Sequence, residues 1–404
     1  MYGLVLEGGG AKGSYQIGAY KAIKEMNIEI GGIAGTSVGA INGALIIQNN
    51  WDRAYDIWYN INLSRLFDVD QVVLNEIRNL NFNHNNIKYI YNRLKTILNN
   101  RGIDLKKIRK LLVENIDEEA IRSSDMDFGI VTINLSEMEP MELYLEDIPE
   151  GSLVDYLIAS SYLPTFKMEK MDGSLYLDGG FYNNLPINLL VDRGYENIIA
   201  VRTYAIGRVP DMKNKKLTID YIAPEENLGG ILEFEQERIR NNIKLGYYDT
   251  LKFFKDLKGK RYYIEIEDSE SSKDRYVDFF LNINQGQLEL LTEILDAKNL
   301  KGKRMLFEKI IPKLAVLLDV DKECDYEDIV LGLMEYAAEK LDIERFKIYK
   351  FDDFVREISD KQKRKEDLET SNIPGFVLHN DLLSRAVKEQ ILNDIIRVIF
   401  AGVK

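Results

Sequence analysis

The sequence predicts an α/β fold, with a mainly parallel central sheet covered by helices on both faces, followed by a mostly helical C-terminal region. Residues 2–6 and 30–35 are short apolar runs, and each of them ends in a glycine-rich turn. The segments that follow them, 11–26 and 38–47, carry small or apolar side chains in patterns typical of helices. Strands that alternate with helices in this way are typical of a parallel sheet buried on both faces.

The remaining segments indicate two domains, which a length of 404 residues also favours. We expect further strands at 128–133 and 197–203 and a long helix at 231–254, within a first domain of residues 1–260. The second domain, 261–404, would contain a short strand at 261–266 and then helices separated by the charged segments 267–275 and 359–369. These helices are expected at 286–297, 303–318, 325–341 and 382–400.

The composition restricts the classes of partner. Hydrophobic residues make up 45% of the chain, and its formal net charge is −13. Such an acidic protein is repelled by nucleic acid and by anionic membrane surfaces, so any contact with lipid must depend on apolar side chains. The single cysteine, Cys324, stands among acidic residues, which disfavour a reactive thiolate. Neither a signal peptide nor a membrane-spanning run is recognisable, so we expect a cytoplasmic protein, with peripheral membrane contact left open.

The strongest chemical motif is the pentapeptide Gly35-Thr36-Ser37-Val38-Gly39. It lies between an expected strand and an expected helix, which is the setting of a nucleophile elbow. The two glycines let the backbone bend, and the amide of Val38 at the start of the helix would face an incoming carbonyl oxygen. Ser37 is therefore the candidate nucleophile. The alternative is a glycine-rich turn that happens to contain a serine.

A second glycine-rich segment, Gly8-Gly9-Gly10-Ala11-Lys12-Gly13, also joins a strand to a helix. Backbone amides with no side chains in front of them form an anion site at a helix N-terminus. Three interpretations compete. A Walker loop would need a Gly-Lys-Ser/Thr ending, which is missing. A dinucleotide fingerprint fits the glycine spacing, but the acidic residue expected at the end of the second strand is replaced by the elbow. An oxyanion loop would use both glycine-rich segments together, and we favour it.

A third motif is Asp178-Gly179-Gly180, which by itself cannot be distinguished from a common Asp-Gly turn. The histidine content gives it weight. The chain has only His84 and His379, and both stand in polar segments typical of loops. Because a Ser-His-Asp triad needs a histidine beside the serine, a hydrolase of this composition would need a carboxylate that acts on the serine directly.

In this order, the glycine-rich loop, the G-x-S-x-G elbow and the Asp-Gly-Gly turn resemble the motif set of patatin-like phospholipases. The resemblance covers roughly residues 3–205 and implies a three-layer α/β/α domain. That family is similar to cytosolic phospholipase A2 in its use of a Ser-Asp dyad. The resemblance therefore implies that Ser37 is the nucleophile and that Asp178 is the base that takes its proton.

The resemblance also implies an oxyanion hole formed by the backbone amides of Gly9, Gly10 and Val38. Lys12 would stand beside this loop and add positive charge, or else lie on the solvated helix surface. The residues expected to support these turns are Gly8, Lys12, Gly13, Gly35, Gly39, Gly179 and Gly180.

The expected activity is hydrolysis of acyl esters of glycerophospholipids or related lipids through an acyl-serine, without a metal or other cofactor. The expected partner is this lipid substrate, with transient contact to a membrane surface left open. Two rival functions remain. One is a non-catalytic lipid-binding or regulatory module with the same fold, and the other is nucleotide binding through the Gly8–Gly13 loop.

One aromatic segment needs a separate interpretation. Trp51, Tyr55, Trp58 and Tyr59 fall on one face of an expected helix. We expect this face to pack on the sheet, because aromatic stripes are usually buried in cores. The alternative is a flap that contacts acyl chains or a membrane interface.

Overall fold

The computed structural model describes residues 1–62, 66, 103–164, 166–167, 169–171, 173–210, 217–266, 272–297, 300–321, 323–366 and 385–401. The chain forms two compact units, Met1–Phe253 and Phe254–Lys404. Both histidines of the sequence, His84 and His379, lie outside the described residues, so the expectation that they are loop residues remains a prediction.

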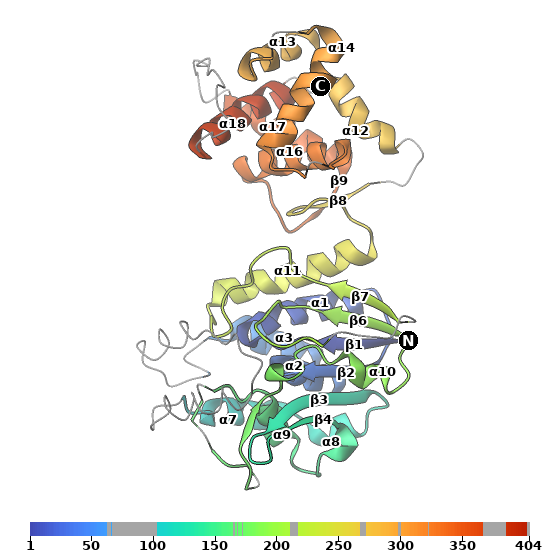
Figure 1. The fold of residues 1–404 in the computed structure, drawn as a ribbon, viewed down its shortest axis with the longest axis vertical. Helices are drawn as coiled ribbons and strands as arrows, with labels where there is room; N and C mark the ends of the chain where they lie inside the picture. Colours follow the sequence, from blue (N-terminus) through green and yellow to red (C-terminus); the bar gives the residue numbers. More distant parts are fainter. Residues whose placement is uncertain are drawn as a thin grey trace. The chain divides into compact units, whose positions relative to one another are not determined.

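A mainly parallel sheet organises the first unit (Figure 1). Its strands follow the order β4-β3-β2-β1-β6-β7, and β5 also pairs with β3. The pairs β1–β2, β1–β6, β2–β3 and β6–β7 are parallel, whereas β4 and β5 run antiparallel to β3. The strands are β1 Tyr2–Leu6, β2 Ile30–Thr36, β3 Asp127–Asn134, β4 Glu139–Tyr144, β5 Tyr176–Asp178, β6 Asn197–Val201 and β7 Thr218–Ile222. The four strands expected in this region are β1, β2, β3 and β6.

Helices cover both faces of this sheet. On one face, Val5, Ala34 and Val131 pack against Leu189 and Leu190 of α10 in a single buried cluster. On the other face, α2 packs on β1, β2 and β3, and α1 packs on α2. The three-layer α/β/α class is therefore confirmed. The helices of this unit are η1 Gly10–Lys12, α1 Gly13–Glu25, α2 Val38–Ile47, α3 Trp51–Asn60, α7 Lys106–Asn115, α8 Glu118–Arg122, η2 Leu145–Asp147, α9 Leu153–Ser160, η3 Gly179–Phe181, α10 Ile187–Val191 and α11 Gln236–Phe254.

The long helix α11 packs closely on α1. A Cβ added at Gly246 would lie 1.9 Å from the carbonyl oxygen of Tyr15, and one added at Gly18 would lie 1.9 Å from that of Ile243. Only glycine allows the two backbones to approach so closely. The sequence placed the start of this helix at residue 231, whereas it begins at Gln236.

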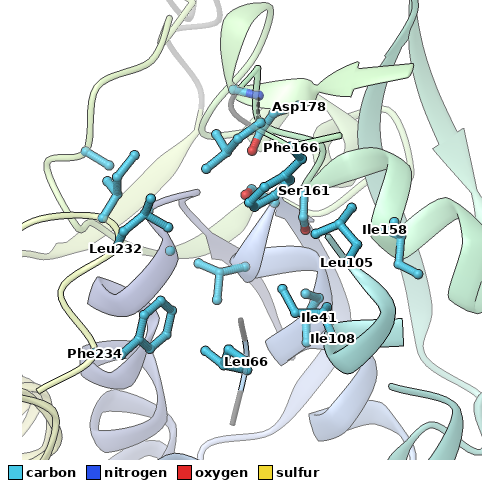
Figure 2. Close-up of a pocket in the computed structure, with 18 of the residues that line it drawn as sticks. Ile41, Leu66, Leu105, Ile108, Ile158, Ser161, Phe166, Asp178, Leu232 and Phe234 are labelled. Atoms are coloured by element: carbon cyan, nitrogen blue, oxygen red, sulfur yellow. Dashed lines mark hydrogen bonds between the residues drawn. The ribbon is translucent and has the colours of Figure 1, made fainter. Parts of the chain in front are cut away.

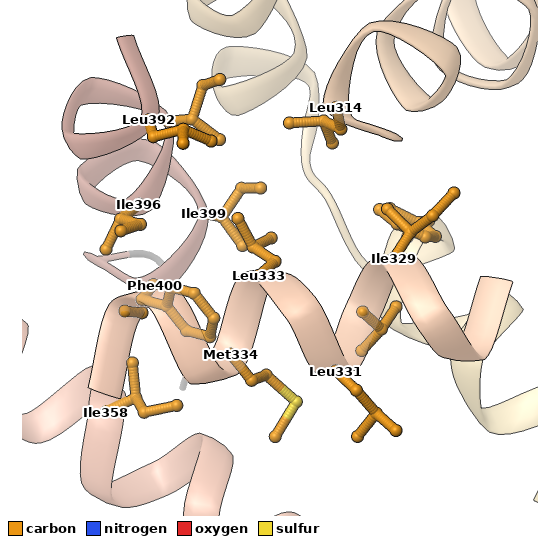
Figure 3. Packing of buried hydrophobic residues seen from close by; sticks show 14 of the residues in the cluster. Leu314, Ile329, Leu331, Leu333, Met334, Ile358, Leu392, Ile396, Ile399 and Phe400 are labelled. Atoms are coloured by element: carbon orange, nitrogen blue, oxygen red, sulfur yellow. The ribbon is translucent and has the colours of Figure 1, made fainter. Parts of the chain in front are cut away.

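The second unit is mostly helical, as expected. Its elements are β8 Tyr263–Glu265, α12 Ser272–Leu281, α13 Gln285–Ile294, α14 Gly302–Met305, π-helical η4 Leu306–Ile310, α15 Ile311–Leu317, α16 Tyr326–Lys340, β9 Ile348–Lys350, α17 Phe351–Glu366 and α18 Arg385–Ala401. β8 pairs with β9 in parallel. Leu333 and Met334 of α16 pack with Ile399 and Phe400 of α18 in one buried cluster (Figure 3).

The charged segment 359–369 was expected to separate helices, and this expectation is wrong as far as Glu366, where α17 ends. Phe354, Ile358 and Gln362 are buried at intervals of four residues, so the segment has one buried face despite its charge. α12 likewise begins inside the other expected separator, 267–275. Among the described helices, none is both long and apolar enough to cross a membrane.

Replacing Gly246 by Ala should destabilise the protein by about 1–3 kcal/mol, because the new methyl group would meet the backbone of α1. Thermal unfolding followed by circular dichroism measures this. Gly230→Ala is the matched control, since a Cβ there has no neighbour closer than 3.6 Å. Equal melting temperatures for the two variants would contradict the close approach of α1 and α11.

Candidate active site

The site begins with the register of three strands. β2 pairs with β3 up to Thr36, opposite Val131. β5 pairs with β3 from the other direction and ends at Asp178, opposite Thr132. Because Val131 and Thr132 are consecutive, the ends of β2 and β5 meet along β3. The sheet thus brings Asp178 beside Ser37, the residue after Thr36.

Ser37 occupies a sharp turn between β2 and α2. Its backbone angles are φ 57° and ψ −127°, a conformation that residues with side chains rarely adopt. The turn is tight, since a Cβ at Gly39 would lie 2.1 Å from the carbonyl oxygen of Leu6. The amide of Ser37 donates a hydrogen bond of 2.8 Å to Oγ of Ser160, the last residue of α9. These features are those of a nucleophile elbow.

Asp178 is buried, with 5% of its surface exposed. Burial raises the pKa of its carboxyl to about 6, and hydrogen bonds from the Ser37 hydroxyl and the Gly180 amide oppose the rise. The Gly180 amide lies 2.7 Å from Oδ1. At neutral pH the carboxyl is therefore mostly ionised, and the neighbouring Ser37 hydroxyl helps to keep its pKa down. A carboxylate with this pKa can take a proton near neutral pH.

The glycine-rich loop presents amides to the same place. The amide of Gly8 donates to the carbonyl of Asn184 at 3.1 Å, and that of Ala11 donates to Ile231 at 2.8 Å. Between them, within the described part of the chain, the amides of Gly9 and Gly10 donate no hydrogen bond. The same holds for Val38 at the start of α2. All three residues line one pocket with Ser37 and Asp178. Free donors in this position could bind a developing oxyanion.

Lys12 is half-buried, and its amine is bonded to backbone carbonyls. Its Nζ donates to the carbonyls of Thr203 and Tyr204, at 3.3 and 3.2 Å, in the segment after β6. Burial lowers the pKa of this amine, and the nearby Glu7 carboxylate opposes that effect. Glu7 itself is fully buried and accepts hydrogen bonds from Arg202 and from the amides of Thr203 and Tyr204. Lys12 therefore joins the loop to the segment after β6 and is not among the residues that line the pocket.

The pocket has a volume of about 280 Å³, with a polar end and an apolar end. Figure 2 shows Asp178 and Ser161 near one end and Leu66 and Phe234 near the other. The apolar walls come mainly from α2, α3, α7, α9 and the segment before α11. They comprise Ile41, Leu45, Ile57, Trp58, Ile61, Leu66, Leu105, Ile108, Leu111, Leu112, Ile158, Leu163, Phe166, Ile231, Leu232 and Phe234. Such a pocket suits a ligand with a reactive polar group and a hydrocarbon chain.

Both tryptophans of α3 are buried, whereas Tyr55 is half-buried and Tyr59 is exposed, so only part of this stripe packs inside the protein. Trp51 packs against Tyr20 of α1, with ring centroids 5.3 Å apart. Trp58 donates to Oδ1 of Asn42 at 2.8 Å and stacks on Phe234. α3 packs mainly on α1 and α2, so the expectation that its aromatic stripe packs on the sheet is wrong. Trp58 also lines the pocket, so it packs in the protein interior and could also contact a ligand bound there.

Three residues of the site were not predicted from the sequence. Ser160 is a buried polar residue at the end of an apolar helix, a pattern that could have identified it. Asn184 and Arg208 also line the pocket. Backbone hydrogen bonds join these two residues to each other and to Gly8 and Gly180, so no local sequence motif predicts their place in the site.

A family model described as patatin-like phospholipase matches residues 4–191. The chain is 27% identical to neuropathy target esterase sws of Drosophila melanogaster over 214 residues, and 30% identical to lysophospholipase nte1 of Aspergillus terreus over 205 residues. Each match covers 49% of this chain and 12% of the relative, so this chain corresponds to a small part of those proteins. The crystal structure of VipD from Legionella pneumophila is similar with a TM-score of 0.40 and 14% identity, over 98% of this chain and 91% of that chain.

The raised pKa of Asp178 predicts a gain in stability on its removal. In the unfolded chain the carboxyl ionises near 3.8, and in the folded protein near 6. Stability is therefore lost as pH rises between these values, by about 3 kcal/mol in total. Asp178→Asn should raise the urea midpoint at pH 8, with a smaller gain at pH 5. Asp125→Asn, at an exposed carboxyl, is the control. A lower midpoint for Asp178→Asn at pH 8 would contradict the burial cost.

Proposed function

We propose that this chain, which belongs to the patatin-like phospholipase family through residues 4–191, is a lipid acyl hydrolase. One observation carries the proposal: the strand register sets the Ser37 elbow beside a buried carboxylate, Asp178, at the polar end of an otherwise apolar pocket. An acyl ester fits this polarity, because its carbonyl needs the polar end and its hydrocarbon chain needs the apolar end. We assign this activity to residues 1–260.

The first step is attack of Ser37 Oγ on the ester carbonyl while Asp178 takes the hydroxyl proton. The negative charge on the carbonyl oxygen is stabilised by the amides of Gly9, Gly10 and Val38. Collapse of this intermediate breaks the ester C–O bond, and the leaving alcohol takes the proton from Asp178. The product is an acyl-serine.

The second step repeats the chemistry with water. Asp178 takes a proton from a water molecule that attacks the acyl-serine, and the same amides stabilise the second tetrahedral intermediate. Collapse releases the fatty acid and returns the proton to Ser37 Oγ. To reach an ester in a bilayer, the protein would contact the lipid surface transiently.

A fluorophosphonate probe should label the wild-type protein covalently at Ser37, and Ser37→Ala should abolish the labelling. Asp178→Asn should slow labelling by about a hundredfold or more, because general-base assistance has that magnitude. In-gel fluorescence measures both variants. Ser123→Ala, at an exposed serine away from the pocket, is the control and should label at the wild-type rate.

Labelling that survives in Ser37→Ala would identify another nucleophile. No labelling of the wild-type protein in the presence of lipid vesicles would favour the rival function, a non-catalytic lipid-binding module.

The rate of ester hydrolysis should follow the ionisation of Asp178. With a pKa of about 6, the base is ionised above this pH and protonated below it. We therefore expect kcat/KM for a short-chain nitrophenyl ester to be constant from pH 7 to 8 and about tenfold lower at pH 5. Tryptophan fluorescence verifies that the protein stays folded. A flat profile over this range would exclude Asp178 as the base.

A further inference from the structure

The polar end of the pocket contains a cationic side chain, Arg208. Among the described residues that line the pocket, Arg208 is the only basic one and Asp178 the only acidic one. Arg208 is exposed, and its guanidinium carbon lies 5.7 Å from the centre of the Tyr182 ring. Among the residues described, no carboxylate forms an ion pair with it. In a chain of net charge −13, such a cation at a pocket mouth is unusual and suggests an anionic ligand.

The backbone holds Arg208 close to the dyad. Its amide donates to the carbonyl of Gly180 at 2.9 Å, and its carbonyl accepts from the amide of Asn184 at 2.7 Å. Gly180 is also the residue whose amide binds Asp178. Arg208 is thus fixed to the turn that carries the carboxylate, although the two are distant in sequence.

Asn184 supplies a second donor at the same place. Its side chain is 98% buried, lines the pocket, and has an amide nitrogen, Nδ2, that finds no partner among the described residues. This nitrogen lies beside Gly207, 2.8 Å from where a Cβ would stand. A buried donor without an acceptor is costly, so a small shift of the Asn184 side chain toward the pocket on binding would let a ligand supply the missing acceptor.

We propose that Arg208 and Asn184 form a binding site for the phosphate of a glycerophospholipid. The proposal rests on the proposed hydrolase function and refines its substrate class. In such a lipid the phosphate is only a few bonds from the acyl ester, so an ester carbonyl at Ser37 leaves the phosphate within the polar end. The planar guanidinium can donate two parallel hydrogen bonds to phosphate oxygens, and the exposed side of Arg208 leaves room for the rest of the headgroup. A neutral glyceride offers neither charge nor acceptor oxygens to match.

The test compares two esters with the same acyl chain, a 1-acyl-glycerophosphocholine and a 1-acylglycerol, both as monomers in solution. Arg208→Gln should lower the ratio of their kcat/KM values by about ten- to a hundredfold, the size of a charge-assisted hydrogen bond. Arg208→Lys should lose less, because it keeps the charge but not the planar fork. Arg240→Gln is the matched control, since Arg240 also stacks on a tyrosine, Tyr59, but does not line the pocket. Its ratio should equal that of the wild-type protein.

An unchanged ratio in Arg208→Gln would overturn the phosphate site while leaving the hydrolase function intact. A binding measurement keeps the two proposals separate if neither ester is hydrolysed. Tryptophan fluorescence, through Trp58 in the pocket wall, would follow binding of an alkyl-glycerophosphocholine and an alkylglycerol, which have no ester, to Ser37→Ala. We expect the phosphate-bearing lipid to bind at least about tenfold more tightly, and this preference to vanish with Arg208→Gln. Equal affinity for the two lipids in Ser37→Ala would overturn the site.

Discussion

The shared edge of β3 is the constraint on which the rest of the site depends. β2 and β5 approach each other along this edge from opposite directions, and they stop at the neighbouring positions Val131 and Thr132. A slip of one residue in either pairing would turn the side chain of Asp178 away from Ser37 or move it along the strand. The elbow, the carboxylate turn and the loop that carries Arg208 are all fixed from this point, so the geometry of the site follows from backbone pairing in the sheet.

Burial of Asp178 lowers the stability of the folded protein but favours its role in proton transfer. An ionised carboxyl away from water weakens the folded state, yet the same burial gives the group a pKa suited to proton transfer near neutral pH. The hydrogen bonds from Ser37 and Gly180 limit the rise, and without them the carboxyl would be protonated over more of the physiological range. Strain at Ser37 is a second local cost of this kind. The sheet, which is buried on both faces, stabilises the fold enough to offset both of these local costs.

The sequence allowed prediction of the parts of the site that depend on local signals. Ser37 lies between an apolar run and a helix of small residues, and its flanking glycines predict the turn. β5 could not be predicted, because three residues show no periodicity and pairing with β3 alone makes them a strand. Ile231, Leu232 and Phe234 have a spacing that favours a helix, but their side chains line the pocket and α11 begins only after them. Asn184 and Arg208 meet through contacts across the fold, which no window of sequence contains.

Two separate sets of elements build the pocket. Strand ends and their turns carry most of the polar groups, whereas α2, α3, α7, α9 and the segment before α11 supply most of the apolar wall. Substitutions in those helices could therefore lengthen, shorten or bend the hydrocarbon channel without disturbing the reacting atoms. Evolution could therefore change the range of accepted acyl chains through substitutions in the apolar wall. The residues that carry out the reaction would be constrained separately and more strictly. A scaffold divided in this way is suited to divergence among lipids that share an ester but differ in their tails.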